Sequence, residues 1–378
     1  MAPVFVASRE HGWYTNKLIH RLVLENLKHR PIRTLLSAIA IGVQVTMILT
    51  LVGVSEGVLG DIAQRSRGTG ADVMVRPPGS SVLAFSGNMP QGVVGVVRKE
   101  PHVAQAIGTL VQTIGNFDSI TGINLDEFNA MSGGLRYLAG GPFTGPDDLI
   151  VDDVYANAHH LKPGDTVDLG LKWRVCGIVE SGKLSHMFAP LASLQEKYSA
   201  TNNVSMVYVK LDDKANTDRV IAALKARLED YRIFSVDQFV SLITVDSIPI
   251  LKRFTNVVIG LAVIVGFLVV FLSMYTAVLE RTREIGILKA LGASPGYIMG
   301  ILLRETLVLA VTGAVAGILM SYGTQWIMKV FVPTMPMFIV FAWWPWAALI
   351  ALAGSMIGAI YPGLKASRQD AIEALAYD

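Results

Sequence analysis

Few residues in this chain of 378 amino acids have the types and spacing that catalysis needs. The stretch from Gly53 to Gly57 matches the G-x-S-x-G pattern of serine hydrolases, in which a strand-to-helix turn exposes the nucleophile. Here the pattern lies inside a long apolar run, which is typical of a membrane helix. We therefore interpret the match as chance and expect no nucleophile at Ser55.

Two adjacent histidines, His159 and His160, are the next candidates for chemistry. Neighbours on a helix point to different faces, and no cysteine or glutamate at ligand spacing completes a metal site. The phosphate-binding pattern G-x-x-x-x-G-K-[ST] does not occur in the sequence. The one cysteine, Cys176, fits a small buried residue of a strand at 173–179. We expect no catalytic residue, metal or cofactor on this chain.

Composition indicates the class of protein. Hydrophobic residues make up 52% of the chain and charged residues 16%, whereas soluble domains have about 25% charged residues. The net charge of +2 gives no reason to expect binding to nucleic acid. The chain is predicted to be a membrane protein.

Four apolar runs are long enough to cross a hydrocarbon core of roughly 30 Å as helices. The predicted transmembrane helices are 34–59, 254–279, 297–328 and 343–363. The polar segment 60–253 is long enough to bury its own core. Its strand-helix-strand signals, with strands at 205–211 and 232–236 and a helix at 217–228, predict an α+β domain. The predicted fold class is a polytopic α-helical membrane protein with four transmembrane helices and an α+β extracytoplasmic domain inserted between helices 1 and 2.

Basic residues in the short loops predict the orientation, because such loops stay in the cytoplasm. They precede the first predicted helix, follow the second and follow the fourth; Lys252 and Arg253 oppose this trend. We expect both termini in the cytoplasm of a bacterium and the chain in its cytoplasmic (inner) membrane. The remaining predicted segments are a cytoplasmic amphipathic helix at 1–33, an outer loop at 329–342 and a cytoplasmic tail at 364–378.

Glycine pairs at four-residue spacing predict close packing of the membrane helices. The pairs are Gly53 and Gly57, Gly313 and Gly317, and Gly354 and Gly358. Four helices are too few to enclose a path for a sizeable substrate, so we expect a dimer.

Aromatic and methionine side chains gather near the outer ends of the third and fourth helices. An aromatic belt at the membrane surface explains them, and a substrate portal between protomers is the alternative. The portal candidates are Met335, Met337, Phe338 and Trp343. Arg304 and Glu305, near the start of the third helix, are interpreted as anchors at the cytoplasmic interface.

A charged segment at 280–296 separates the second and third helices. Ile285, Leu288 and Gly292 share one face of a short amphipathic helix, which Gly292 and Pro295 would end. A basic loop held in the cytoplasm is the simpler interpretation, but such a loop needs no helix with alternating glutamate and arginine. We interpret the segment as a lever for a soluble partner.

The stretch from Glu280 to Ala293 closely resembles the signature E-R-x-R-E-I-G-x-L-K-A-L-G-A of the FtsX-like permeases of ABC transporters, the superfamily that includes MacB, LolC/LolE and DevC. The tail from Tyr361 to Leu375 resembles the family ending, with Ala371 in place of the usual proline. Residues 26–36 are similar to the family's entry to the first membrane helix, and 161–167 are more weakly similar to its outer domain.

The resemblance implies a non-catalytic permease subunit that pairs with a second copy or a paralogue. A separate ABC ATPase subunit would bind ATP and Mg and move the outer domain through the membrane helices. This movement would extrude or extract a hydrophobic or amphiphilic substrate, with a periplasmic adaptor or membrane-fusion protein as a further partner. Coupling to the ATPase would rest on Glu280, Arg281, Arg283, Glu284, Gly286, Lys289 and Gly292.

Two other functions fit parts of the sequence. One is an FtsX-like signal transmitter that regulates a periplasmic or cell-wall enzyme; the large outer domain favours transport over this. The other is a membrane-anchored sensor without an ATPase, against which the coupling motif argues.

Overall fold

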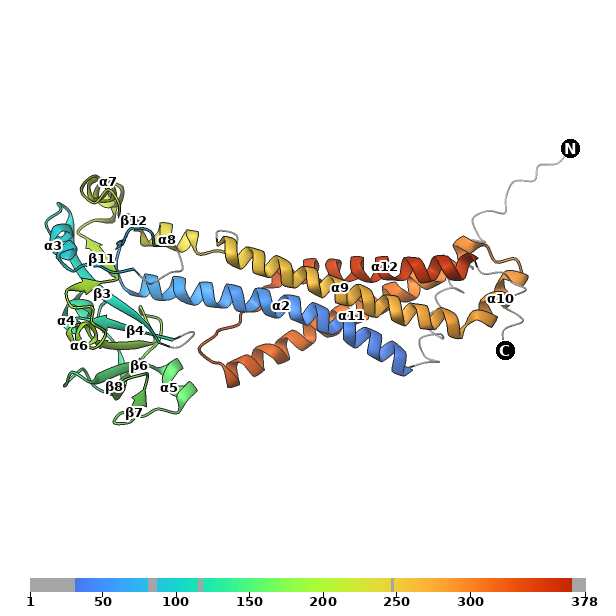
Figure 1. Cartoon of the computed structure of the whole chain (residues 1–378), viewed down its shortest axis with the longest axis horizontal. Helices are drawn as coiled ribbons and strands as arrows, with labels where there is room; N and C mark the ends of the chain where they lie inside the picture. Colours follow the sequence, from blue (N-terminus) through green and yellow to red (C-terminus); the bar gives the residue numbers. More distant parts are fainter. Residues whose placement is uncertain (1–30, 81–86, 115–117, 246–247, 369–378) are drawn as a thin grey trace. The chain divides into compact units, whose positions relative to one another are not determined.

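The computed structural model describes residues 31–80, 87–114, 118–245 and 248–368 (Figure 1). The described chain divides into two compact units. The helical unit comprises residues 31–54, 253–326 and 338–368, and the α/β unit comprises Ser55–Lys252 and Ile327–Met337. The predicted amphipathic helix at 1–33 and the end of the predicted cytoplasmic tail lie outside the described residues, apart from the short overlaps at 31–33 and 364–368.

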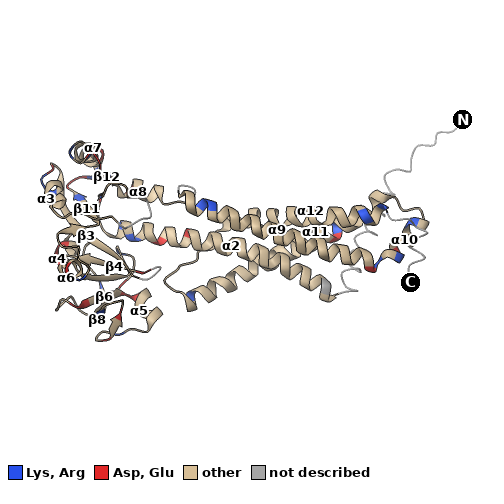
Figure 2. Ribbon diagram, in the orientation of Figure 1, with Lys and Arg blue, Asp and Glu red and all other residues tan. Residues whose placement is uncertain are grey.

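Four long helices are apolar enough to cross a membrane by length and composition, as predicted. They are α2 (Pro31–Gly68), α9 (Pro249–Glu280), α11 (Pro295–Phe331) and α12 (Trp344–Arg368). Three of them begin at proline, whose fixed φ suits the first helical position and whose missing N–H is not needed there. Figure 2 shows few charged residues along the middle of these helices. The first helix runs past its predicted end at Leu59 to Gly68.

The α/β unit contains a ten-stranded mixed sheet, in the order β12-β1-β11-β3-β4-β9-β6-β8-β5, with β7 paired to β8. A separate pair joins β2 and β10. The strands are β1 (Val73–Arg76), β2 (Met89–Pro90), β3 (Val103–Ile114), β4 (Asp118–Ile123), β5 (Tyr137–Gly140), β6 (Asp148–Asp152), β7 (Thr166–Asp168), β8 (Lys172–Val179), β9 (Met187–Pro190), β10 (Asn203–Val204), β11 (Met206–Leu211) and β12 (Arg232–Ser235).

Shorter helices accompany these strands. In the α/β unit they are α3 (Gly92–Arg98), α4 (Leu125–Ser132), α5 (Asp153–His159), α6 (Leu191–Lys197), the short 3-10 helix η1 (Lys214–Asn216), α7 (Thr217–Arg227) and α8 (Val236–Leu242); the helical unit has α10 (Thr282–Ala290) and η2 (Phe341–Trp343). The predicted strand-helix-strand is β11-α7-β12. Strand β1 lies between its two strands and pairs antiparallel with both. All four residues of β1 are buried, which explains its unbroken run of apolar residues before Arg76.

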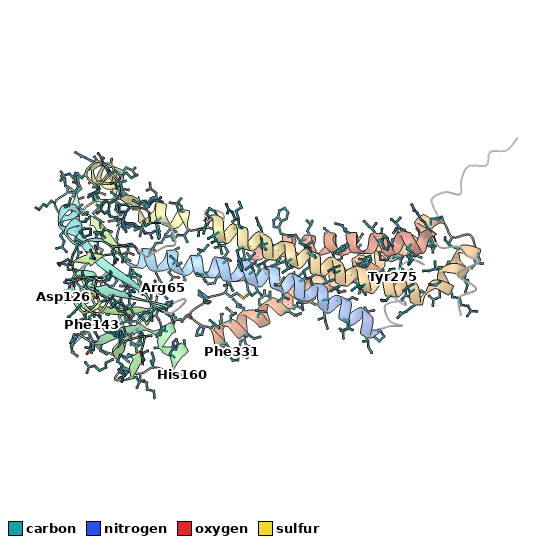
Figure 3. The ribbon with its side chains drawn as sticks, in the orientation of Figure 1. Arg65, Asp126, Phe143, His160, Tyr275 and Phe331 are labelled. Carbon is teal, nitrogen blue, oxygen red and sulfur yellow. The ribbon has the colours of Figure 1, made fainter. Side chains whose placement is uncertain are left out.

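The last turns of α2 belong to the α/β unit, and polar contacts hold them there. Figure 3 labels Arg65, which makes several of these contacts. Arg65 donates from Nε to Asp61 at 2.6 Å and from Nη2 to Oδ2 of Asp152 at 3.1 Å. The Arg65 carbonyl accepts from the backbone N–H of Leu184 at 3.1 Å. A side chain at Gly68 would collide with the carbonyl of Gly182. Residues 55–68 are thus a built-in part of this unit.

Candidate functional site

The loop between α9 and α11 folds as the short helix α10, inside the predicted 280–296 segment. Gly292 has a φ of +92°, a left-handed conformation that glycine adopts without strain. Its N–H donates to the carbonyl of Lys289 at 2.9 Å, and that of Ala293 to Leu288 at 2.9 Å. These bonds satisfy carbonyls that the helix end would leave open. Pro295 then starts α11, so Gly292 ends the helix as predicted.

One face of α10 packs inward. Thr282, Ile285 and Gly286 are buried. Ile285 belongs to the same apolar core as Val278 of α9 and Leu302 of α11. Gly286, predicted to face the ATPase, therefore lies on the side of the helix that packs against the rest of the chain.

The opposite face of α10 is open to solvent. Arg283 and Glu284 are exposed. One helical turn further on, Ile287 is 45% exposed, and Leu291, just past the helix, is 80% exposed. Charged residues beside large exposed apolar ones are suited to binding another protein, where the apolar groups would be covered. We call Arg283, Glu284, Ile287 and Leu291 the coupling face.

The remaining predicted coupling residues fall outside this face. Glu280 and Gly292 are exposed at its two ends, and Lys289 is half-buried. Arg281 is buried, and its Nη1 donates to Oε2 of Glu305 at 3.2 Å. Glu305 is 1% exposed, so its side chain faces the interior of the helical unit; its place at the cytoplasmic interface stays a prediction. The sequence motif did not predict that Arg281 points inward, because its direction depends on the contact with Glu305 of the neighbouring helix α11.

Glycines pack helices within the chain. A Cβ at Gly317 would lie 2.5 Å from the carbonyl oxygen of Gly42 in α2, and a Cβ at Gly358 would lie 2.8 Å from that of Phe267 in α9. Thr46 donates from Oγ1 to the carbonyl of Gly317 at 3.0 Å. The other predicted glycines differ in how closely they pack. A Cβ at Gly313 would be too close to Ala38 and Ile41, and one at Gly57 would collide with Pro336, whereas one at Gly354 would make ordinary contacts. The carbonyl of Gly53 accepts a hydrogen bond from the N–H of Phe338.

The four portal candidates differ in exposure. Phe338 is 48% exposed, whereas Met337 is 3% exposed. Met335 is half-buried, and Trp343 packs on the core of the helical unit. Phe338 is the member of this set that presents a large apolar surface.

The other sequence candidates for chemistry have structural positions. Ser55 lies inside α2 and is buried, so no nucleophile elbow forms. The ring of His159 lies 4.3 Å from that of Tyr155, and His160 caps α5 with a φ of +54°. Within the described ranges, no three His, Cys, Asp or Glu side chains form a group that could hold a metal ion.

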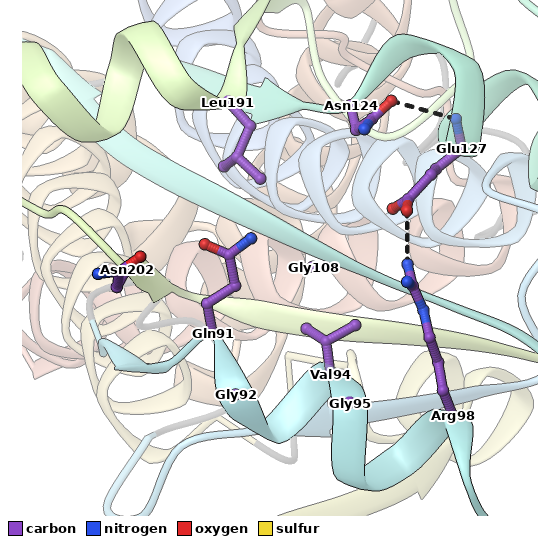
Figure 4. Close-up of a pocket in the computed structure, with 10 residues that line it drawn as sticks. All are labelled: Gln91, Gly92, Val94, Gly95, Arg98, Gly108, Asn124, Glu127, Leu191 and Asn202. Atoms are coloured by element: carbon purple, nitrogen blue, oxygen red, sulfur yellow. Dashed lines mark hydrogen bonds and ion pairs between the residues drawn. The ribbon is translucent and has the colours of Figure 1, made fainter.

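A cavity of about 490 Å³ lies in the α/β unit (Figure 4). It is lined by Gln91, Gly92, Val94, Gly95, Arg98, Gly108, Asn124, Glu127, Leu191 and Asn202. Its two charged residues pair with each other, since Arg98 Nη2 donates to Glu127 Oε1 at 2.6 Å. The side chain of Asn124 accepts from the N–H of Glu127, capping α4. The charges of the cavity lining therefore balance, and the rest of the lining mixes polar residues such as Gln91 with apolar ones such as Leu191.

Two family models match the chain. The MacB-like periplasmic core domain matches residues 34–227, just over half of the chain. The FtsX-like permease C-terminal domain matches residues 256–371, which include α10 and the coupling face.

Curated relatives agree with these models. The chain is 25% identical over 404 residues to the uncharacterized ABC transporter permease YknZ of Bacillus subtilis (strain 168), covering 95% of this chain and 98% of that protein. It is 24% identical over 396 residues to the macrolide export ATP-binding/permease protein MacB of Escherichia coli, covering 94% of this chain. The chain spans 60% of the length of that MacB.

Solved structures also resemble part of the chain. The periplasmic region of MacB from Actinobacillus actinomycetemcomitans matches 47% of this chain and 94% of that structure, with 18% identity and a TM-score of 0.36. The extracellular domain of the noncanonic ABC-type transporter YknZ from Gram-positive bacteria matches 43% of this chain and 98% of that structure, with 19% identity and a TM-score of 0.34.

Proposed function

Because the chain belongs to the FtsX-like permeases with a MacB-like periplasmic core domain, we propose that it couples ATP hydrolysis on a separate ABC ATPase to movement of its own α/β unit. The ATPase subunit would hold ATP and Mg in the cytoplasm. Two permease chains, identical or paralogous, would assemble with it in a bacterial inner membrane.

The main observation that supports this proposal is the coupling face. It presents Ile287 and Leu291 to solvent beside the charges of Arg283 and Glu284. Exposed apolar side chains at a cytoplasmic surface cost solvation free energy that a protein partner would recover. The helix behind them is fixed in the helical unit by Ile285, so a push on this face would move α9 and α11.

The substrate in this proposal is a hydrophobic or amphiphilic molecule taken from the outer leaflet or the periplasm, and an adaptor protein would complete the exporter. The similarity to MacB of Escherichia coli, a macrolide export protein, supports a substrate of this kind. Lipid and small-molecule mass spectrometry of the purified complex would identify the class.

The orientation can be tested by labelling. We propose that α10 faces the cytoplasm and the α/β unit faces outward. A cysteine at exposed Ala215 should react with an impermeant maleimide in intact spheroplasts, and one at exposed Ser294 should react only after lysis. The reverse pattern would reject this topology.

The ATPase partner can be tested by co-purification. A tagged wild-type chain should retain an ABC ATPase in mild detergent. Glu284→Lys and Leu291→Asp should reduce that recovery by about tenfold or more, since loss of an interface contact of 2–5 kcal/mol has at least this effect. Lys99→Glu, an exposed charge reversal in the α/β unit, is the matched control and should bind normally. Equal recovery with all three variants would reject the coupling face.

A further inference from the structure

Arg281 occupies the corner between two helices. α9 ends at Glu280 and α10 begins at Thr282, so Arg281 is the single residue between them, with a φ of −112° and a ψ of 16°. Its N–H donates to the carbonyl of Val278 in α9 at 3.2 Å. Its carbonyl accepts from the N–H of Ile285 in α10 at 3.0 Å. The backbone of Arg281 is therefore hydrogen-bonded to both helices.

The side chain of Arg281 reaches a third helix. Its Nη1 lies 3.2 Å from Oε2 of Glu305, and the side chains of Arg281 and Glu305 are 10% and 1% exposed. Glu305 is ten residues beyond the start of α11 at Pro295, or roughly 15 Å along the helix at 1.5 Å per residue. Leu302 and Leu309, three residues before and four residues after Glu305 on α11, belong to the apolar core of the helical unit.

Such a pair is a poor means of gaining stability alone. Removing two charges from water has a large cost, and a pair of apolar residues of similar size is often as stable or more so. Ionisable residues inside membrane proteins are rare and mark functional positions. The contact joins the corner at α10 to the interior of α11, so its geometry suits the transmission of a displacement.

We infer that Arg281 and Glu305 are positioning residues that make α11 move with the coupling helix. This rests on the proposed function, because the displacement originates at the ATPase. The motif then divides into two parts: Arg283 and Glu284 contact the partner, and Arg281 passes its movement inward. Substitution of Arg283 or Glu284 prevents ATPase binding. Substitution of Arg281 or Glu305 leaves binding intact but removes the stimulation of ATP turnover by the permease.

The experiment measures binding and turnover separately, with the chain in lipid nanodiscs and the co-purifying ATPase added back. Glu305→Gln keeps the shape of the side chain and removes its charge. It should bind the ATPase with unchanged Kd and lower permease-stimulated turnover by about five- to tenfold, a typical size for coupling between sites. The double variant Arg281→Glu with Glu305→Arg restores the pair in reverse and should recover turnover. Arg283→Gln is the matched control on the exposed face and should weaken binding instead.

Other results would overturn the inference. Normal stimulated turnover in Glu305→Gln would show that the pair transmits nothing. A parallel loss of binding and turnover would make Arg281 and Glu305 part of docking or of folding. If Glu305→Gln melts at a lower temperature than wild type, the double variant Arg281→Met with Glu305→Leu replaces the ion pair by an apolar pair and restores stability. This variant should bind the ATPase without stimulating its turnover. Full stimulated turnover in it would contradict the role of the charges. Failure of the wild type to bind any ATPase would reject the proposed function itself.

Discussion

Arg65 and Asp152 form a buried ion pair, with side chains that are 7% and 1% exposed, between the last turns of α2 and the end of β6. Asp152 also accepts from the N–H of Tyr155 at 2.8 Å, and His186 Nδ1 lies 2.8 Å from its Oδ2. One carboxylate thus caps α5 and holds α2. This contact attaches the end of a predicted membrane helix to the sheet of the α/β unit.

We predict that Arg65→Ala destabilises the α/β unit by about 1.5–3 kcal/mol, because the buried carboxylate of Asp152 loses its charged hydrogen-bond donor but keeps its contacts with Tyr155 and His186. Thermal unfolding of the full chain in detergent would measure this as a lower melting temperature. Arg67→Ala is the control in the same turn. Its ion pair with Asp237 is long, at 3.8 Å, and 60% and 90% exposed, so a change of about 0–1 kcal/mol is expected. Equal effects of the two variants would contradict a special role of Arg65.

Gly317 should not accept a side chain. Gly317→Ala would place a methyl group 2.5 Å from the carbonyl oxygen of Gly42, and such overpacking costs about 1–3 kcal/mol. Gly323→Ala lies on the same helix with nothing within 4 Å of the new atom, and alanine favours the helix by up to about 1 kcal/mol. Melting temperatures in detergent should fall for Gly317→Ala and stay level or rise for Gly323→Ala. The same shift in both variants would refute the packing of α2 against α11.

Asp148 should make the α/β unit sensitive to acid. Burial raises the pKa of this carboxyl, but hydrogen bonds from Thr144, Arg174 and Gly145 outweigh burial and lower the pKa below its ordinary value. A depressed pKa contributes stability above the unfolded pKa of about 3.9, and this stability is lost as pH falls through the folded value. Asp148→Asn should therefore lower the melting temperature at pH 7 and differ less from wild type below about pH 4.

The neighbouring residue provides the control for this pH profile. Asp147 is 64% exposed and pairs with Lys197 at the surface, so Asp147→Asn should have little effect at either pH. A constant difference between Asp148→Asn and wild type across the pH range would contradict the lowered pKa.

Cys176 should react slowly with maleimide. Burial, and secondly the carboxylate of Asp148, raise the pKa of this thiol to about 11, and its Sγ lies 3.5 Å from the carbonyl of Leu149. Because the thiolate is the nucleophile, labelling at pH 7.5 should be roughly a hundredfold slower than at a cysteine placed at Ala215. Unfolding in denaturant should remove the difference. Rapid labelling of the native chain would contradict the burial of Cys176 and would also spoil it as a silent background for the topology test.

The long helices could be predicted from sequence because their signal is local: about 20 consecutive apolar residues fit a membrane. The extension of α2 to Gly68 could not, since the residues after Leu59 include Asp61 and Arg65. Arg65 is buried and Asp61 half-buried, and Arg65 contacts Asp152, 87 positions further along the chain. The polarity of these residues ended the predicted helix at Leu59, whereas tertiary contacts stabilise its continuation to Gly68.

The helix α10, which we propose as the coupling site, was predictable in place, but the direction of its side chains was not. The motif, with Gly292 and Pro295, located the helix. Which charged side chains of the motif face solvent depends on the packing against α11. The sequence alone does not distinguish Arg281, which is buried, from Glu284, which is exposed. The apolar residues Ile287 and Leu291 were missed because apolar residues were assigned to the inner face. Their spacing of four, in step with Arg283, is the signal that could have revealed them.

We propose that the exposed side of α10 contacts an ATPase. Photo-crosslinking tests this contact most directly, from a benzoylphenylalanine introduced at single positions of the full chain in the complex with its co-purifying ATPase. Positions Ile287 and Leu291 should crosslink to the ATPase, whereas Ile285, which is 7% exposed on the inner face, should crosslink within its own chain. Crosslinks to the ATPase from Ile285 and none from Leu291, in a complex that still co-purifies, would contradict the account.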